Sequence, residues 1–150
     1  MKPTHSDLSI ERAAIIHHDL IAIMLTEYLS ELGADTNYPY LHLYWKEAER
    51  IPYLFRIRDE LIGFGLVRTI GCRAYEMAEF WIKNRHRRNG IGRTAATALF
   101  ETQPGEWSVS SYPGSIGSEI FWRKVTARYH PEITTYNETS APSYRFQVQQ

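Results

Sequence analysis

One segment constrains this chain more than any other: a strand, a basic loop and a helix follow one another without a linker. Residues 74–82 (AYEMAEFWI) alternate as a half-buried strand does, and residues 94–100 (TAATALF) open a helix with small side chains. Between them lies the basic loop, residues 85–93 (RHRRNGIGR). This order points several backbone N–H groups and the positive end of the helix dipole at one place. It therefore predicts an anion-binding site at the start of the helix.

The residue types of the basic loop suit a phosphate. Gly90 and Gly92 let the backbone approach a phosphate closely and accept a positive φ. Arg87, Arg88 and Arg93 offer charge-assisted hydrogen bonds to phosphate oxygens. The alternative is a solvated surface turn, because glycines and a run of basic residues are weak evidence by themselves. We favour the phosphate site.

Two general phosphate motifs fit the loop less well. A P-loop needs G-x-x-x-x-G-K-[ST], which the sequence lacks. Residues 90–95 (GIGRTA) fit the G-x-G-x-x-A of a dinucleotide fold, but that fold wants an acidic residue about 20 positions further on. Ser110, Ser111 and Tyr112 stand there, and hairpin strands precede the glycines. An NAD(P)-binding domain therefore remains an alternative.

Length and charge narrow the class of protein. The 150 residues, 43% of them hydrophobic, predict one packed domain over residues 1–150 and exclude a disordered or low-complexity chain. The sequence has 17 Lys and Arg residues and 17 Asp and Glu residues, so its formal net charge is zero. No global electrostatic field therefore draws the molecule to nucleic acid or to an anionic membrane. Any polyanion site must be local. We expect neither nucleic acid nor membrane as a partner, and leave a homodimer open.

Cysteine and histidine give no sign of a metal site. Cys72 is the single cysteine, which excludes an intrachain disulfide and suits a reducing compartment, so we expect a cytoplasmic protein. The N-terminus lacks the apolar stretch of a signal peptide, and no apolar run reaches the ~18 residues of a spanning helix. His17 and His18 are adjacent and so point to different faces of a helix. We expect no metal.

The rest of the chain predicts strands and helices in mixed order. The expected strands and helices are a strand over 8–13, a helix capped by Asp19 and ending at Gly33, a shorter helix over 40–50, hairpin strands over 53–57 and 62–66, a strand over 107–111, a helix over 115–127 and a strand over 144–148. Early hairpins and a late β–α–β crossover predict an α/β (α+β) fold. Its single sheet is mixed and mostly antiparallel, with helices on both faces.

The basic loop also resembles a known motif. Residues 87–92 (RRNGIG) are similar to the R/Q-x-x-G-x-G/A motif of the GNAT N-acetyltransferase superfamily, and residues 80–82 (FWI) stand at the spacing of its acetyl-CoA strand. Residues 121–124 (FWRK) resemble the aromatic pair of its last helix, and the order of elements is that of the superfamily over most of the chain. The resemblance implies a single GNAT domain.

The resemblance also implies an acetyl-CoA site. In that superfamily the amides of the motif cradle the pyrophosphate of CoA, and the strand before it pairs through its backbone with the pantetheine arm. Carried over to this sequence, Arg87 begins the motif. The remaining cofactor-binding positions are Arg88, Asn89, Gly90, Ile91, Gly92 and Arg93 in the loop and Phe80, Trp81 and Ile82 in the strand. The superfamily also separates this strand from the next one to admit the thioester.

The implied reaction moves an acetyl group directly to a primary amine of a small molecule or a protein. It needs a base, and the superfamily commonly uses a Glu in the cofactor strand, where Glu76 and Glu79 stand. With regular alternation Glu76 shares the face of Phe80 and Ile82 and is the better candidate, whereas a bulge would reverse the roles. For each residue the alternative is a salt bridge or a strand-edge carboxylate.

The sequence departs from the superfamily at the general acid, the residue that would protonate the departing thiolate of CoA. Trp122 stands where a tyrosine is frequent, and an indole cannot protonate a thiolate usefully. Tyr112, Tyr129, Ser118 or water remain as substitutes. The departure keeps a second class open, a CoA-binding module without catalysis.

The resemblance places the first two helices over the acceptor. A cluster of aromatic residues lies at and just before the second of them: Tyr38, Tyr40, Tyr44 and Trp45. The cluster either lines a pocket for an apolar or cationic amine or packs in the core.

Overall fold

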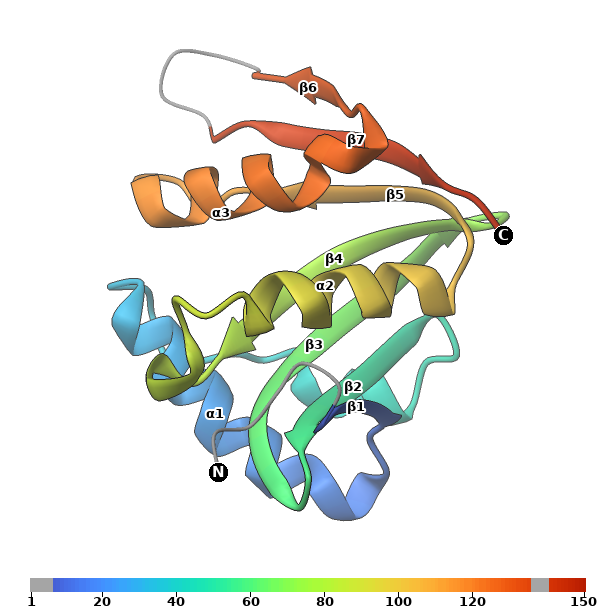
Figure 1. The fold of residues 1–150 in the computed structure, drawn as a ribbon. Helices are drawn as coiled ribbons and strands as arrows, with labels where there is room; N and C mark the ends of the chain where they lie inside the picture. The colour runs from blue at the N-terminus through green and yellow to red at the C-terminus, as the bar shows by residue number, and fades with distance from the viewer. Residues whose placement is uncertain (1–6, 136–140) are drawn as a thin grey trace.

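The computed structural model describes residues 7–135 and 141–150, which form a seven-stranded sheet in the order β1-β2-β3-β4-β5-β7-β6 (Figure 1). The strands are β1 (Leu8–Arg12), β2 (Arg50–Ile57), β3 (Glu60–Gly71), β4 (Ala74–Ile82), β5 (Gly105–Ser110), β6 (Glu132–Thr134) and β7 (Ser143–Val148). Every neighbouring pair is antiparallel except β4 and β5, which are parallel. The predicted mixed, mostly antiparallel sheet of an α+β domain is confirmed.

Helices cover both faces of this sheet. The α-helices are α1 (His18–Glu31), α2 (Ile91–Thr102) and α3 (Ile116–Thr126), and short 3-10 helices are η2 (Ile15–His17), η3 (Leu41–Trp45), η4 (Asn84–His86) and η5 (Ala127–Tyr129). In Figure 1 α2 and α3 lie in front of the sheet, and α1 lies behind it. Two cores result, one on each face.

The central strands supply both cores. On the α1 face, Ile21 and Leu25 of α1 pack with Leu54 and Phe64 of the sheet. The other face buries a larger cluster that joins the sheet to α2 and α3 and includes the fully buried Trp107. Because β2 and β3 are covered on both faces, they read in the sequence as nearly continuous apolar runs.

The predicted second helix is wrong in type and length. Residues 41–45 form only the 3-10 helix η3, and β2 has begun by Arg50. Arg50, the last residue of the expected helix, pairs instead with Arg68 of β3 and belongs to the sheet. Tyr44 is buried against α1 and the sheet, which fixes η3 there.

Smaller differences lie at the ends of other elements. The first helix begins at His18, so Asp19 lies in its first turn instead of capping it. Strand β6 has only three residues and was not predicted; it pairs with β7 at the sheet edge. A run this short carries no alternation for the sequence to reveal.

Strands β4 and β5 separate partway along their length. Their pairing runs from Ala74 opposite Glu106 to Met77 opposite Val109 and stops there. Beyond that point, among the described residues, β4 pairs only with β3, up to Ile82. Figure 1 shows the two strands side by side near the C-terminus of the chain and apart toward the start of α2. In the part of the chain that the structure describes, one backbone edge of β4 therefore has no strand partner over residues 78–82.

Candidate functional site

A β-bulge in β4 decides where its carboxylates point. Opposite β4, Leu66 pairs with Glu79 and Val67 pairs with Met77, so Ala78 is an extra residue. Met77 packs on the α2 face, as Phe80 and Ile82 do, whereas Trp81 packs on the α1 face. The bulge thus reverses the alternation between its two sides.

Both glutamates consequently lie on the α1 face. Glu79 contacts Tyr28 of α1, and Glu76 pairs with Arg68, which follows the α1-facing Leu66 by two residues in β3. The expectation that Glu76 shares a face with Phe80 and Ile82 is therefore wrong. The reason is the bulge at Ala78, the interruption on which that expectation depended.

The two carboxylates have different surroundings. The hydroxyl of Tyr28 donates a hydrogen bond to Oε1 of Glu79 at 3.2 Å. Burial raises the pKa of the Glu79 carboxyl to about 7; the Tyr28 hydrogen bond acts in the opposite direction, and the charge of Glu76 adds to the rise. Glu76 lies at 3.6 Å from Arg68 with 39% of its side chain exposed, which is an ordinary surface ion pair. Glu79 is thus the carboxylate suited to exchange a proton near neutral pH.

The basic loop has the backbone geometry of a helix N-terminus. Gly90 is the N-cap of α2 with φ of 83°, and Arg88 also has a positive φ, 66°. The side chain of Asn89 accepts a hydrogen bond from the amide of Ile91 at 3.2 Å. The first-turn amides of Gly92 and Arg93 have no carbonyl partner within the helix. They point out of the helix start, where an anion is stabilised.

The three arginines of the loop differ in their contacts. Arg87 donates to the carbonyl of Ile82 at 2.8 Å and to the carboxylate of Glu31 at 2.6 Å. It therefore fastens the loop to β4 and α1. Arg88 and Arg93 are exposed, and neither forms an ion pair with any residue that the structure describes. They are the arginines available to a phosphate.

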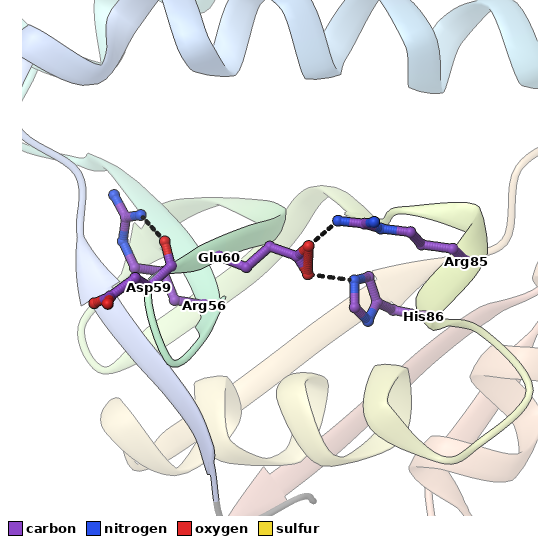
Figure 2. Close-up of polar contacts among 5 residues, drawn as sticks. All are labelled: Arg56, Asp59, Glu60, Arg85 and His86. Carbon is purple, nitrogen blue, oxygen red and sulfur yellow. Dashed lines mark hydrogen bonds and ion pairs between the residues drawn. The ribbon is translucent and has the colours of Figure 1, made fainter. Parts of the chain in front are cut away.

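A second anchor joins the basic loop to the β2–β3 turn. Figure 2 shows Glu60 between Arg85 and His86, with Oε2 of Glu60 at 2.9 Å from Nε2 of His86. Burial, together with the positive Arg85 and Lys83, lowers the pKa of His86, so its neutral ring donates to Glu60. In the same turn Arg56 donates to the carbonyl of Asp59. The sequence marks Glu60 only as a polar corner, because its partners lie 25 and 26 residues away.

The cofactor-strand residues offer their backbone and not their side chains. Phe80 stacks on Phe121 of α3, and Trp81 is buried and donates from Nε1 to Glu31. Ile82 is buried on the α2 face. Gly92 lies tightly against this layer, since a Cβ there would be 3.1 Å from the ring of Phe121. The start of α2 is thereby held close to the unpaired edge of β4.

The structure separates the candidate acids. Trp122 is buried against Phe80, and Tyr129 stacks on Phe146 in the α2-face core, away from the glutamates. The hydroxyl of Ser118 accepts the amide of Tyr112. Tyr112 itself, just after β5, is near enough to Tyr28 to influence its ionisation. Tyr112 is therefore the candidate on the side of Glu79.

The aromatic cluster divides between core and surface. Tyr44 is buried in the α1-face core, and Tyr38 packs against that core. Tyr40 is 51% exposed, and the guanidinium of Arg50 lies 5.7 Å from its ring and 5.4 Å from that of Tyr44. Tyr38 and Tyr44 are both close enough to Glu79 to feel its charge. The cluster thus borders the candidate base.

Comparison with known proteins identifies the family. Residues 18–106 match the acetyltransferase (GNAT) family, a span that holds α1, the basic loop and both glutamates. The chain belongs to the GNAT acetyltransferase family. A search among curated proteins gives no match.

Solved structures share the fold. An acetyltransferase from Thermus thermophilus superposes with a TM-score of 0.76 at 12% identity, over 94% of this chain and 97% of that one. Diaminobutyrate acetyltransferase from Paenibacillus lautus, in complex with L-2,4-diaminobutyric acid and coenzyme A, gives 0.69 at 14% identity, over 94% and 95%. Spermidine N-acetyltransferase from Vibrio cholerae, with CoA and spermine, gives 0.69 at 12% identity, over 97% and 96%.

The described residues contain neither a group of metal ligands nor a membrane-spanning helix. Within residues 7–135 and 141–150 no three His, Cys, Asp or Glu side chains are grouped to hold a metal ion. None of the helices in these ranges has the length and apolarity to cross a membrane.

Proposed function

We propose that this protein transfers the acetyl group of acetyl-CoA directly to a primary amine, with Glu79 as the base. One observation carries the proposal: the half-buried carboxyl of Glu79, held by the Tyr28 hydroxyl, lies on β4 where β5 has parted from it, and desolvation raises its pKa to about 7. A general base works best when its pKa is close to the pH at which the enzyme acts. Family membership supports the acetyl donor.

The residues present fit a CoA molecule. We assign the pyrophosphate to the basic loop, through the first-turn amides of α2 and the exposed Arg88 and Arg93. The pantetheine arm would pair with the edge of β4 that β5 leaves open, along Phe80, Trp81 and Ile82, where the Ile82 carbonyl also accepts from Arg87. Bound acetyl-CoA would supply an activated acyl group with a thiolate as leaving group.

The protein groups then handle protons. Glu79 removes a proton from the acceptor ammonium, because only the neutral amine attacks the thioester carbonyl. The new C–N bond forms as the C–S bond breaks, and the nitrogen gives up a second proton, which replaces the one that the acid gives to the thiolate, so the products are the acetamide and CoA thiol. We propose Tyr112 as the donor of the thiol proton, because it is the candidate close enough to Tyr28, the partner of Glu79, to influence its ionisation.

The acceptor is assigned only as a class. We propose a small-molecule or protein amine that enters from the α1 face, beside Tyr38 and Tyr40. Similar folds bind L-2,4-diaminobutyric acid or spermine, which makes these amines the first acceptors to test. Cytoplasm remains the proposed compartment, on the argument from the single cysteine.

Two measurements test the proposal. Calorimetric titration should show binding of CoA and none of NADP, and the release of CoA thiol should depend on an added amine. CoA binding without turnover on a panel of small amines and lysine peptides would favour the non-catalytic module. Binding of NADP in place of CoA would favour the dinucleotide-binding alternative.

A further inference from the structure

Tyr28 occupies a position that the transfer reaction as proposed leaves unexplained. It lies on α1, half-buried, with its ring edge-on to Phe64 of β3 at 5.9 Å. Its hydroxyl reaches across to Glu79 on β4, and the two residues are 51 positions apart in the chain. Ring packing alone would be served equally well by phenylalanine. The hydroxyl therefore needs a separate explanation.

Few other groups stabilise the negative charge of the Glu79 carboxylate. Within residues 7–135 and 141–150 no Lys, Arg or His forms an ion pair with Glu79. A buried carboxylate without a cation loses much of its hydration, and a hydrogen-bond donor is the remaining means to stabilise its charge. The Tyr28 hydrogen bond engages Oε1, which leaves Oε2 to accept a proton.

We propose that Tyr28 is a positioning residue for acetyl transfer, whose hydroxyl holds the Glu79 carboxylate in place and stabilises its ionised, proton-accepting form. The inference rests on the proposed function, in which Glu79 is the base. Tyr28 acts through Glu79 and makes no contact with the donor in this account. Without its hydroxyl, Glu79 holds its proton to higher pH and fewer molecules carry a working base at neutral pH.

The other groups around Glu79 do not replace this role. Glu76, on the same strand, is negative and opposes ionisation of Glu79; Arg68 is engaged with Glu76. Tyr38 and Tyr44, in the segment between α1 and β2, are close enough to Glu79 to feel its charge, and the positive Arg50 acts on their pKa values in the opposite direction. Burial raises the pKa of Tyr28, Tyr38 and Tyr44 above the ordinary value, so these hydroxyls stay neutral in the range where Glu79 titrates.

The first experiment measures the titration of the Glu79 carboxyl in the absence of substrates. Carboxyl-carbon NMR titration of the full chain, with Glu79→Gln to assign the signal, gives the midpoint in wild type and in Tyr28→Phe. We expect the midpoint to rise by about one pH unit in Tyr28→Phe, the scale of one charge-assisted hydrogen bond. Tyr38→Phe is the matched control: it also removes the hydroxyl of a half-buried tyrosine close to Glu79, but one that makes no hydrogen bond with it, and it should leave the midpoint in place.

The second experiment measures how kcat/KM for acetyl transfer depends on pH. With L-2,4-diaminobutyric acid or spermine as the amine, Tyr28→Phe should lower kcat/KM about tenfold below pH 7, recover toward wild type above pH 8, and leave CoA affinity unchanged. An unmoved midpoint and acidic limb in Tyr28→Phe would overturn the inference and leave Glu79 as base. Full activity in Glu79→Gln would instead overturn the proposed base itself, whatever Tyr28→Phe does.

Discussion

At the scale of single residues, two half-buried glutamates three positions apart differ in their surroundings: desolvation raises the pKa of Glu79, whereas Glu76 forms a surface ion pair with Arg68. Glu79→Gln should retain CoA affinity, reduce turnover by about 10²-fold or more and flatten the acidic limb of the pH–rate profile. Glu76→Gln is the matched control, and its effect should be smaller because Glu76 forms a surface ion pair with Arg68. Steady-state kinetics with calorimetric CoA titration check both variants. Equal losses in the two variants would contradict the assignment.

The raised pKa of Glu79 also predicts how stability depends on pH. The pKa rises from 4.5 to about 7 on folding, so between these values the folded state holds a proton that the unfolded state has released. This contribution to stability is fully present below about pH 4.5 and is lost as the pH rises through about 7.

Glu79→Gln removes this titration and leaves a carbonyl that Tyr28 can still bond. We therefore expect the variant to melt a few °C higher than wild type at pH 8, and the difference to shrink toward pH 5. Thermal melts across this range, with Glu76→Gln as control, measure it. A wild type that melts above Glu79→Gln at pH 8 would show that burial of the carboxylate carries no such cost.

At the scale of elements, hydrophobic periodicity and turn residues predicted the helices and strands that depend on the local sequence. The order of strand, basic loop and helix, the β2–β3 hairpin and the first helix follow from periodicity and turn residues, and all are present. The bulge at Ala78 was not predictable, because it depends on how β4 pairs with Leu66 and Val67 of another strand. The assignment of Glu76 to the face of Phe80 and Ile82 failed for that reason alone. The contacts that Glu60 and Glu31 make with the basic loop were also not predictable, because the partners lie far apart along the chain.

The helix start at Gly90 supports a sharp test of the basic loop. Gly90→Asp brings a side chain and a negative charge to the place proposed for the pyrophosphate, so CoA affinity should fall by about 100-fold or more. Gly114→Asp is matched to it, since both glycines have φ of 83° and Gly114 lies outside the loop with open space around its Cβ position. Both variants should lose similar stability in thermal melts. Only Gly90→Asp should lose CoA in calorimetric titration, and equal CoA affinity in the two would refute the site.

The arginines of the loop should separate binding from anchoring. Arg88→Ala or Arg93→Ala should weaken CoA about tenfold with little change in melting temperature, because each removes an exposed charge. Arg87→Ala should lower the melting temperature, because it removes the link between Ile82 and Glu31. Melting curves paired with CoA titration decide this. A purely binding defect in Arg87→Ala would mean that Arg87 serves the ligand directly.

At the scale of the whole molecule, charge is balanced while the proposed donor site is not. Lys and Arg equal Asp and Glu in number, yet Arg88 and Arg93 stand exposed at the start of α2. Salt therefore has little net repulsion or attraction to screen across the fold, whereas it screens a polyanion bound at that loop. Stability and ligand affinity should respond to salt differently.

Raising NaCl from about 0.05 M to about 0.5 M shortens the Debye length from roughly 14 Å to roughly 4 Å. We expect CoA affinity to fall severalfold over this range, because its phosphates meet the loop through charge-assisted bonds near solvent. Pantetheine, which carries no phosphate, is the control ligand, and its weaker binding along β4 should not depend on salt. The melting temperature of the free protein should stay within a degree or two, because its surface ion pairs contribute little individually. CoA binding that is indifferent to salt would place the phosphates away from the basic loop, and a parallel fall for pantetheine would trace the effect to the fold instead of the phosphate contacts.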